Sequence, residues 1–156
     1  MQDCVTLKGS MEIALRDANT GEEIERIHVN NTVVTAGRAW VLQHIAGSAV
    51  FGGNTTSPLS YVAVGTSTTA PTTGDTGLGS EVTRLTIQNF TSSNLTSNPP
   101  SYQIECSFAT NLANTTLGEV GLFNSSGSGT MLAHATFGTI NKTTSNTLGI
   151  SYTVSA

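Results

Sequence analysis

Histidine and glutamate are the side chains with which this 156-residue sequence could catalyse hydrolysis. A hydrolytic triad needs a nucleophile, a histidine base and an orienting acid. The three histidines are scattered along the chain, and no Gly-x-Ser-x-Gly nucleophile elbow is present. We therefore expect a strand-surface position for His28 and a polar helix position for His44. We expect His134 to point away from Ala133 and Ala135, and we assign none of the three a catalytic role.

A pair of carboxylates could cleave a glycosidic bond if the two groups stood several ångströms apart. Glu105 and Glu119 are the candidates, because both lie in or near predicted strands. Charged residues in strands more commonly face solvent, so a small glycan hydrolase stays a remote alternative. We predict that the protein is not an enzyme, and the sequence assigns no catalytic residue.

Metal ions, cofactors and nucleic acids have no recognisable site in the sequence. It contains no histidine–cysteine cluster, no EF-hand loop, and no Gly-Lys-Ser/Thr ending in its long polar loop, so we predict neither a metal nor a cofactor. The net charge of −4 and the absence of a basic run argue against nucleic-acid binding. No amphipathic anchor, long apolar stretch or secretion signal is present, so we expect no membrane partner.

The two cysteines, Cys4 and Cys106, could form a disulfide or remain separate thiols. Two distant cysteines in a chain without a secretion signal favour separate thiols. Cys106 lies in a run of alternating apolar and polar residues, which predicts a small core residue at this position.

Hydrophobic periodicity predicts the elements that would position these side chains. An α-helix is expected over 35–46, with Thr35 as N-cap, Gly47 as the C′ residue, and Trp40, Val41 and Ile45 on its buried face. Period-two alternation or short apolar runs predict eight strands, at 11–16, 22–29, 59–64, 82–90, 102–108, 117–124, 130–137 and 148–154.

These elements predict an all-β fold, a β-sandwich of seven or eight strands with one short α-helix. A jelly roll is one such arrangement. We expect residues 1–156 to form a single domain, in which residues 1–10 are either an extended N-terminal arm or a frayed terminus. A bulge is expected near Glu25. Gly121 and Gly149 within strands predict bulges or close backbone approach. Long loops are expected at 65–79 and 91–101.

The following segments occur in an order that is familiar from a known group of proteins: Asn31–Arg38, Tyr61–Pro71, Gly74–Leu78 with Glu81 and Arg84, Glu119–Asn124, Gly129–Ala133, Ala135–Phe137, Ile140–Lys142 and Leu148–Thr153. This order resembles a broad group of small structural proteins of tailed bacteriophages. The resemblance extends from about residue 30 to the end of the chain. Its motifs are strand and turn patterns, so the resemblance brings no active-site residues with it.

The resemblance implies a virion protein, either a head decoration (cement) protein or a tail-fibre or tail-collar part. We expect a capsid decoration protein, made in the host cytoplasm and located on the outer capsid surface. It would bind the major capsid protein, as a homotrimer. A tail-fibre or tail-tip module that binds a host receptor is the alternative. The contact residues expected are Gln2, Val5 and Leu7 in the arm and Thr66, Thr69, Asp75 and Asn94 in or near the long loops.

Overall fold

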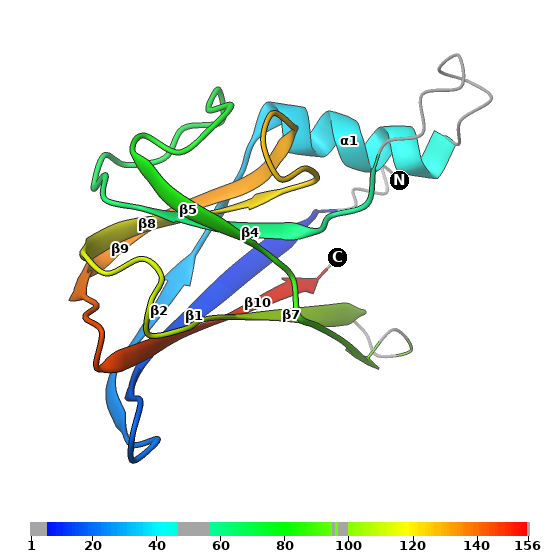
Figure 1. Ribbon diagram of the computed structural model, residues 1–156. Helices are drawn as coiled ribbons and strands as arrows, with labels where there is room; N and C mark the ends of the chain where they lie inside the picture. The colour runs from blue at the N-terminus through cyan, green and yellow to red at the C-terminus, as the bar shows by residue number, and fades with distance from the viewer. Residues whose placement is uncertain (1–5, 47–56, 95, 97–99, 156) are drawn as a thin grey trace.

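The computed structural model describes residues 6–46, 57–94, 96 and 100–155. Two antiparallel five-stranded sheets pack face to face, and helix α1 (Thr35–Ala46) lies beside the second sheet (Figure 1). Sheet A has the order β2 (Glu23–Asn30), β1 (Lys8–Asp17), β10 (Asn146–Ser155), β7 (Ser101–Phe108) and β6 (Asn89–Asn94). Sheet B has the order β3 (Thr32–Val33), β9 (Met131–Asn141), β8 (Thr116–Phe123), β4 (Tyr61–Gly65) and β5 (Glu81–Thr86). The predicted β-sandwich is confirmed, but the described part of the chain has ten strands instead of the expected seven or eight.

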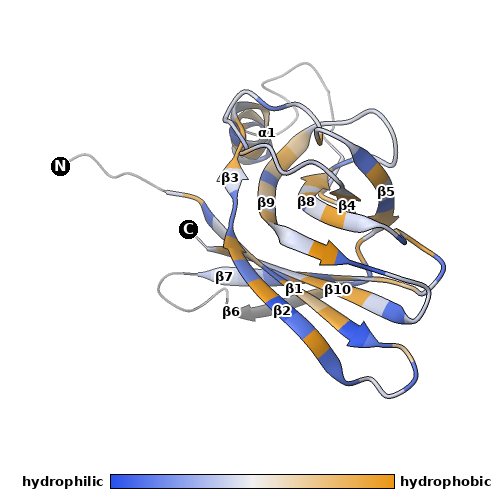
Figure 2. Ribbon diagram, turned by 90° about the vertical axis from the view of Figure 1, so that its left-hand side faces the viewer, coloured by the Kyte–Doolittle hydropathy of each residue, from blue (hydrophilic) through white to orange (hydrophobic). Residues whose placement is uncertain are grey.

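The core lies between the two sheets and follows from side-chain alternation. Along β10 the residues Leu148, Ile150, Tyr152 and Val154 are buried, and the residues between them face away from the core. Figure 2 shows the same alternation of hydrophobic and hydrophilic residues along β1 and β2. Because side chains of a strand point alternately to its two faces, a sequence of this pattern places one face of sheet A inward and the other outward.

The β1–β2 hairpin has the turn and the bulge that its sequence predicts. The Asp17 carboxylate accepts hydrogen bonds from the amides of Asn19 (2.8 Å) and Thr20 (2.9 Å). Gly21 adopts a φ of 74°, which glycine tolerates without steric cost. Leu15 pairs with Glu25 while Arg16 pairs with Glu23, which leaves the residue between these two glutamates as the extra residue of a bulge.

The single strand predicted over 82–90 is wrong, because two strands in different sheets occupy this segment. β5 ends at Thr86 in sheet B, and β6 begins at Asn89 in sheet A. The Ile87 amide bonds to the Ser60 carbonyl beside sheet B (2.7 Å), and the Gln88 amide bonds to a carbonyl of β7 (3.0 Å). The side chain of Ile87 is buried where the chain crosses between the layers, so hydrophobic periodicity continued across the break and concealed it.

Helix α1 has the predicted bounds and packs closely on β9. A Cβ atom added at Gly37 would overlap the Leu132 backbone, so only glycine allows this approach. Trp40 and Val41 are half-buried against the core, and the side chain of Ile45 lies outside the described residues. Trp40 thus lies on the buried face of the helix as predicted, and its indole N–H donates to the Ser57 carbonyl (3.1 Å). In the described part of the chain, no helix is long and apolar enough to cross a membrane.

Candidate functional site

A fully buried glutamate holds the segment between β4 and β5, which we call loop 66–80, against the outer face of sheet B. Glu119 of β8 is 0% exposed. Its carboxylate accepts hydrogen bonds from the amides of Ser67 (3.2 Å), Gly79 (2.9 Å) and Ser80 (2.7 Å). These three amides lie at the two ends of the loop, so one carboxylate fixes where the loop leaves the sheet and where it returns.

His134 extends this arrangement to the middle of the loop. It lies on β9, and its Nε2 is 3.1 Å from the Glu119 carboxylate. Its Nδ1 is 2.8 Å from the carboxylate of Asp75 in loop 66–80. Ionised carboxylates only accept hydrogen bonds, so both ring nitrogens of His134 donate, or one carboxyl retains a proton. We call Glu119, His134 and Asp75 the Glu119 network.

Asp75 is held in its ionised form by local hydrogen bonds. The Thr72 hydroxyl (2.6 Å) and the Thr72 amide (2.9 Å) donate to its carboxylate. The Thr72 hydroxyl, then the Thr72 amide, then His134 lower the pKa of Asp75 to about 2. Asp75 therefore carries its negative charge at neutral and mildly acidic pH, and loop 66–80 has a fixed anion next to the His134 ring.

The Glu119 network contains residue types found in catalytic sites, but its geometry is that of an anchor. His134 is 4% exposed, and both of its ring nitrogens already face carboxylates. A general base must reach the proton that it removes from a substrate. His134 could do so only after loop 66–80 had moved away and one of these hydrogen bonds had been broken.

Apolar contacts supplement the network beneath the loop. Leu78 of loop 66–80 packs against a small cluster of Val34, Ala63, Phe123 and Met131 on the outer face of sheet B. A Cβ atom at Gly121 would come within 2.9 Å of the Leu78 side chain, so a side chain, and not the expected second backbone, makes the close approach at this glycine. At the edge strand β5, the Arg84 guanidinium lies 3.6 Å from the centre of the Phe123 ring, in cation–π geometry.

The expectation that Glu119 faces solvent is wrong, and the structure separates the two glutamates considered for glycan hydrolysis. Glu105 is half-buried on the outer face of sheet A, whereas Glu119 is enclosed at the outer face of sheet B. The core lies between them, so the two carboxylates do not flank a common substrate position. His28 and His44 are exposed, as predicted. His134 does point away from Ala133 and Ala135, but it is buried beneath the loop.

The seven predicted contact residues have different environments. Thr66 and Thr69 are exposed, Asp75 belongs to the Glu119 network, and Leu7 is half-buried against the core. Asn94 lies in β6 opposite Ser101 of β7. Gln2 and Val5 lie outside the described residues.

Two further groups that can ionise are buried, Lys142 near the turn before β10 and Cys106 in the core. Lys142 is 1% exposed, and its ammonium group donates to the Ala109 carbonyl (2.9 Å) and to the Asn114 side chain (3.0 Å). Burial lowers the pKa of Lys142. Burial raises the pKa of Cys106 to about 11, and this thiol is a core residue as predicted. Cys4 lies outside the described residues.

In the part of the chain that the structure describes, no three His, Cys, Asp or Glu side chains are arranged so that they could hold a metal ion. The chain matches no protein-family model, no curated protein and no solved structure at a significant level.

Proposed function

We propose that this protein is a structural component of a tailed-bacteriophage particle that binds the outer surface of the head as a decoration protein and stabilises the shell. The order of segments from Asn31 to Thr153 motivates the proposal by its resemblance to phage structural proteins. The observation that carries it is the Glu119 network. In this network the buried side chains of Glu119 and His134 hold a surface loop in place. A fixed surface loop is what a binding protein needs.

Loop 66–80 has the properties of a preorganised contact surface. Thr66, Thr68, Thr69 and Thr73 are exposed, while the loop backbone is tied to the sheet through Glu119. Ordering a loop at the moment of binding costs conformational entropy, and a loop ordered during folding avoids this cost. The exposed hydroxyl groups can donate and accept hydrogen bonds with a protein surface.

The partner in this proposal is the major capsid protein, and the protein acts as a closed homotrimer. A capsid offers the same surface many times in a symmetric lattice, so weak contacts multiply when the binding protein is itself oligomeric. Sedimentation equilibrium of the purified protein tests the trimer directly, since a monomeric mass at working concentration contradicts it.

Immunogold labelling of intact virions, with antibody against this protein, tests the proposal as a whole. Gold distributed over the head is the expected result. Gold confined to the tail contradicts the decoration role and supports the receptor-binding alternative. Particles that carry no gold, although the antibody recognises the purified protein, contradict a virion role altogether.

A binding assay with capsids that lack the protein tests the loop. We expect Thr69→Arg to abolish co-sedimentation with capsids, because a bulky charge replaces an exposed hydroxyl in the contact surface. Thr144→Arg is the matched control, since Thr144 is exposed in the turn between β9 and β10. Equal binding of the two variants contradicts loop 66–80 as the contact surface.

A further inference from the structure

The outer face of sheet A carries an aligned row of polar side chains that the proposed function does not use. The strand register places Asn89 beside Glu105, Glu105 beside Ser151, Ser151 beside Glu12, and Glu12 beside His28. The row therefore crosses all five strands of the sheet. It lies on the side of the sandwich opposite loop 66–80.

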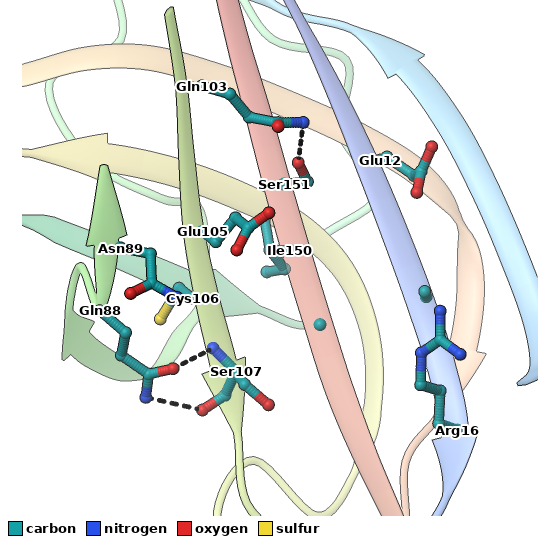
Figure 3. Close-up of a pocket in the computed structure, with 12 residues that line it drawn as sticks. Glu12, Arg16, Gln88, Asn89, Gln103, Glu105, Cys106, Ser107, Ile150 and Ser151 are labelled. Atoms are coloured by element: carbon teal, nitrogen blue, oxygen red, sulfur yellow. Dashed lines mark hydrogen bonds between the residues drawn. The ribbon is translucent and has the colours of Figure 1, made fainter. Parts of the chain in front are cut away.

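An open groove of about 430 Å³ follows this row across the middle of the sheet. Its floor is made of small residues, among them Ala14, Gly149 and Ser151. Figure 3 shows longer polar side chains on both sides of the groove, with Glu12 and Arg16 along one side and Gln88 and Asn89 along the other. This volume lies within the range of sites for small ligands, roughly 300–1,000 Å³.

Several of the long side chains around the groove are held by partners. The Gln88 side-chain amide exchanges two hydrogen bonds with the Ser107 backbone, of 3.0 and 3.2 Å. Gln103 donates to the Ser151 hydroxyl (Figure 3). At the other side, Glu12 is ion-paired with Arg26. Because these side chains are fixed before a ligand arrives, binding would require little further ordering.

Glu105 is the exception, and it lies between Asn89 and Ser151 in the row. Its carboxylate is half-buried, and within the described part of the chain no hydrogen bond or ion pair reaches it. The Asn89 side-chain amide beside it is likewise without a partner among the described residues. A ligand hydroxyl that replaces water on this carboxylate makes a charge-assisted hydrogen bond, which is one of the stronger kinds.

We propose that this groove binds a neutral oligosaccharide. Adjacent sugar hydroxyls present paired donors and acceptors, which match the two oxygens of the Glu105 carboxylate and the amide of Asn89. Sulfated or phosphorylated ligands are disfavoured by the Glu105 carboxylate, because Glu12 and Arg16 at the side of the groove are already ion-paired with Arg26 and Glu23. A peptide strand has no free edge to pair with here, because β1, β10 and β7 are each paired on both sides.

The groove predicts weak binding at each copy. Among the described residues that line it there is no aromatic side chain on which a sugar ring could stack. We therefore expect a dissociation constant of the order of 1 mM for one site, which repeated copies on a particle would raise to useful avidity. This inference does not depend on whether the protein sits on the head or on the tail.

Nuclear magnetic resonance titration of the purified, isotope-labelled protein tests the proposal without a virion. The probes are maltotriose, mannotriose, chitotriose and galactotriose, with 3′-sialyllactose as an anionic comparison and calcium chloride as a cation comparison. We expect at least one neutral trisaccharide to shift the backbone amides of Glu105 and Ser151 and the side-chain amide of Asn89 in a saturable manner.

Two variants locate the site and keep the fold intact. Gly149→Leu fills the groove, and its Cβ atom meets nothing closer than the Ala14 carbonyl at 3.9 Å. Gly138→Leu is the matched control in β9, where the nearest atom is 4.0 Å away. We expect Gly149→Leu to abolish saccharide binding and Gly138→Leu to leave it unchanged. Glu105→Gln should weaken binding about tenfold, because hydrogen bonds to a charged acceptor are the stronger ones.

Any of the following outcomes overturns the proposal. They are the absence of saturable shifts with every neutral trisaccharide, shifts confined to loop 66–80, unchanged binding by Gly149→Leu, and stronger binding of the anionic than of the neutral sugars. A shift of the Glu105 amide by calcium alone, with none by sugars, would also overturn it and make the groove a cation site. None of these outcomes bears on capsid binding, so this inference and the proposed function fail separately.

Discussion

Replacement of Glu119 by alanine tests whether this residue is the anchor of loop 66–80. The change removes the common acceptor of the Ser67, Gly79 and Ser80 amides and the partner of the His134 ring. Three amides would then lose their acceptor, and the His134 ring would lose its partner on sheet B. Since Glu119 is 0% exposed, water cannot replace the carboxylate unless the loop lifts from the sheet.

The expected magnitude follows from the four hydrogen bonds. At about 1 kcal/mol for each net hydrogen bond, Glu119→Ala should lower the free energy of unfolding by about 4 kcal/mol. Removal of one partner from a buried charged network commonly costs about 3–5 kcal/mol, which agrees with this sum. Glu119→Gln keeps one acceptor oxygen but turns its amide group toward the Gly79 N–H, so we expect about half of that loss.

Urea unfolding measures the change in stability, and hydrogen exchange locates it. In Glu119→Ala the amides of Ser67, Gly79 and Ser80 should exchange faster than amides in β10, because the loop opens before the core. Glu25→Gln is the control, since Glu25 is exposed and should alter stability by less than about 0.5 kcal/mol. A loss below about 1 kcal/mol in Glu119→Ala, with protection of the three amides unchanged, would refute the anchor.

Three further predictions concern acid, packing and thiol chemistry. Asp75 has a folded-state pKa of about 2 against an ordinary 3.8, so its contribution is complete above about pH 4 and is lost as the pH falls toward 2. Urea unfolding should show that the free energy of unfolding of the unaltered protein falls between about pH 5 and about pH 2 by about 1 kcal/mol more than that of Asp75→Asn, a difference already reduced by solvent screening. A Cβ atom at Gly65 would overlap the Ser80 carbonyl and the Glu119 carboxylate, so Gly65→Ala should lower the thermal midpoint and cost about 2 kcal/mol. Unchanged stability of Gly65→Ala would show that loop 66–80 shifts to make room for the added methyl group, and would contradict this prediction. The Cys106 thiol is 2% exposed with a pKa raised to about 11, so peptide mass spectrometry should find it unlabelled by iodoacetamide in native protein and labelled in urea. Rapid native labelling would contradict its burial.

The elements were predictable from sequence where one face of a strand is buried and the other is not. β7 and β10 alternate strictly, and their predicted bounds lie within two residues of those observed. The crossing at Ile87 was not predictable in this way, because a buried residue between two sheets continues the apolar pattern of the strand before it. Hydrophobic periodicity indicates which residues are buried, but it does not indicate to which of the two sheets a buried residue belongs.

The burial of Glu119 could have been inferred, but its partners could not. Leu117, Val120, Leu122 and Phe123 place apolar side chains on both faces of β8, which is typical of a strand covered on both sides. A carboxylate in such a strand must be hydrogen-bonded, because an unpaired buried charge is too costly. Which groups satisfy it depends on how loop 66–80 folds back over the sheet, and the loop sequence of small polar residues has no period from which that path can be read.

Gly121 and Gly149 differ in their role because loop 66–80 covers the first and the second lies on an open sheet face. Both are glycines inside strands, and the sequence predicts the same role for each. At Gly121 the loop residue Leu78 occupies the space where a side chain would stand, so glycine permits the loop to close on sheet B. At Gly149 no described loop crosses the strand, and a Cβ atom would meet no described atom closer than 3.9 Å. The missing side chain there leaves a groove instead of a contact, so the expectation of close approach at Gly149 is wrong. Loop 66–80 thus covers the outer face of sheet B, whereas in the described part of the chain the outer face of sheet A keeps an open polar groove.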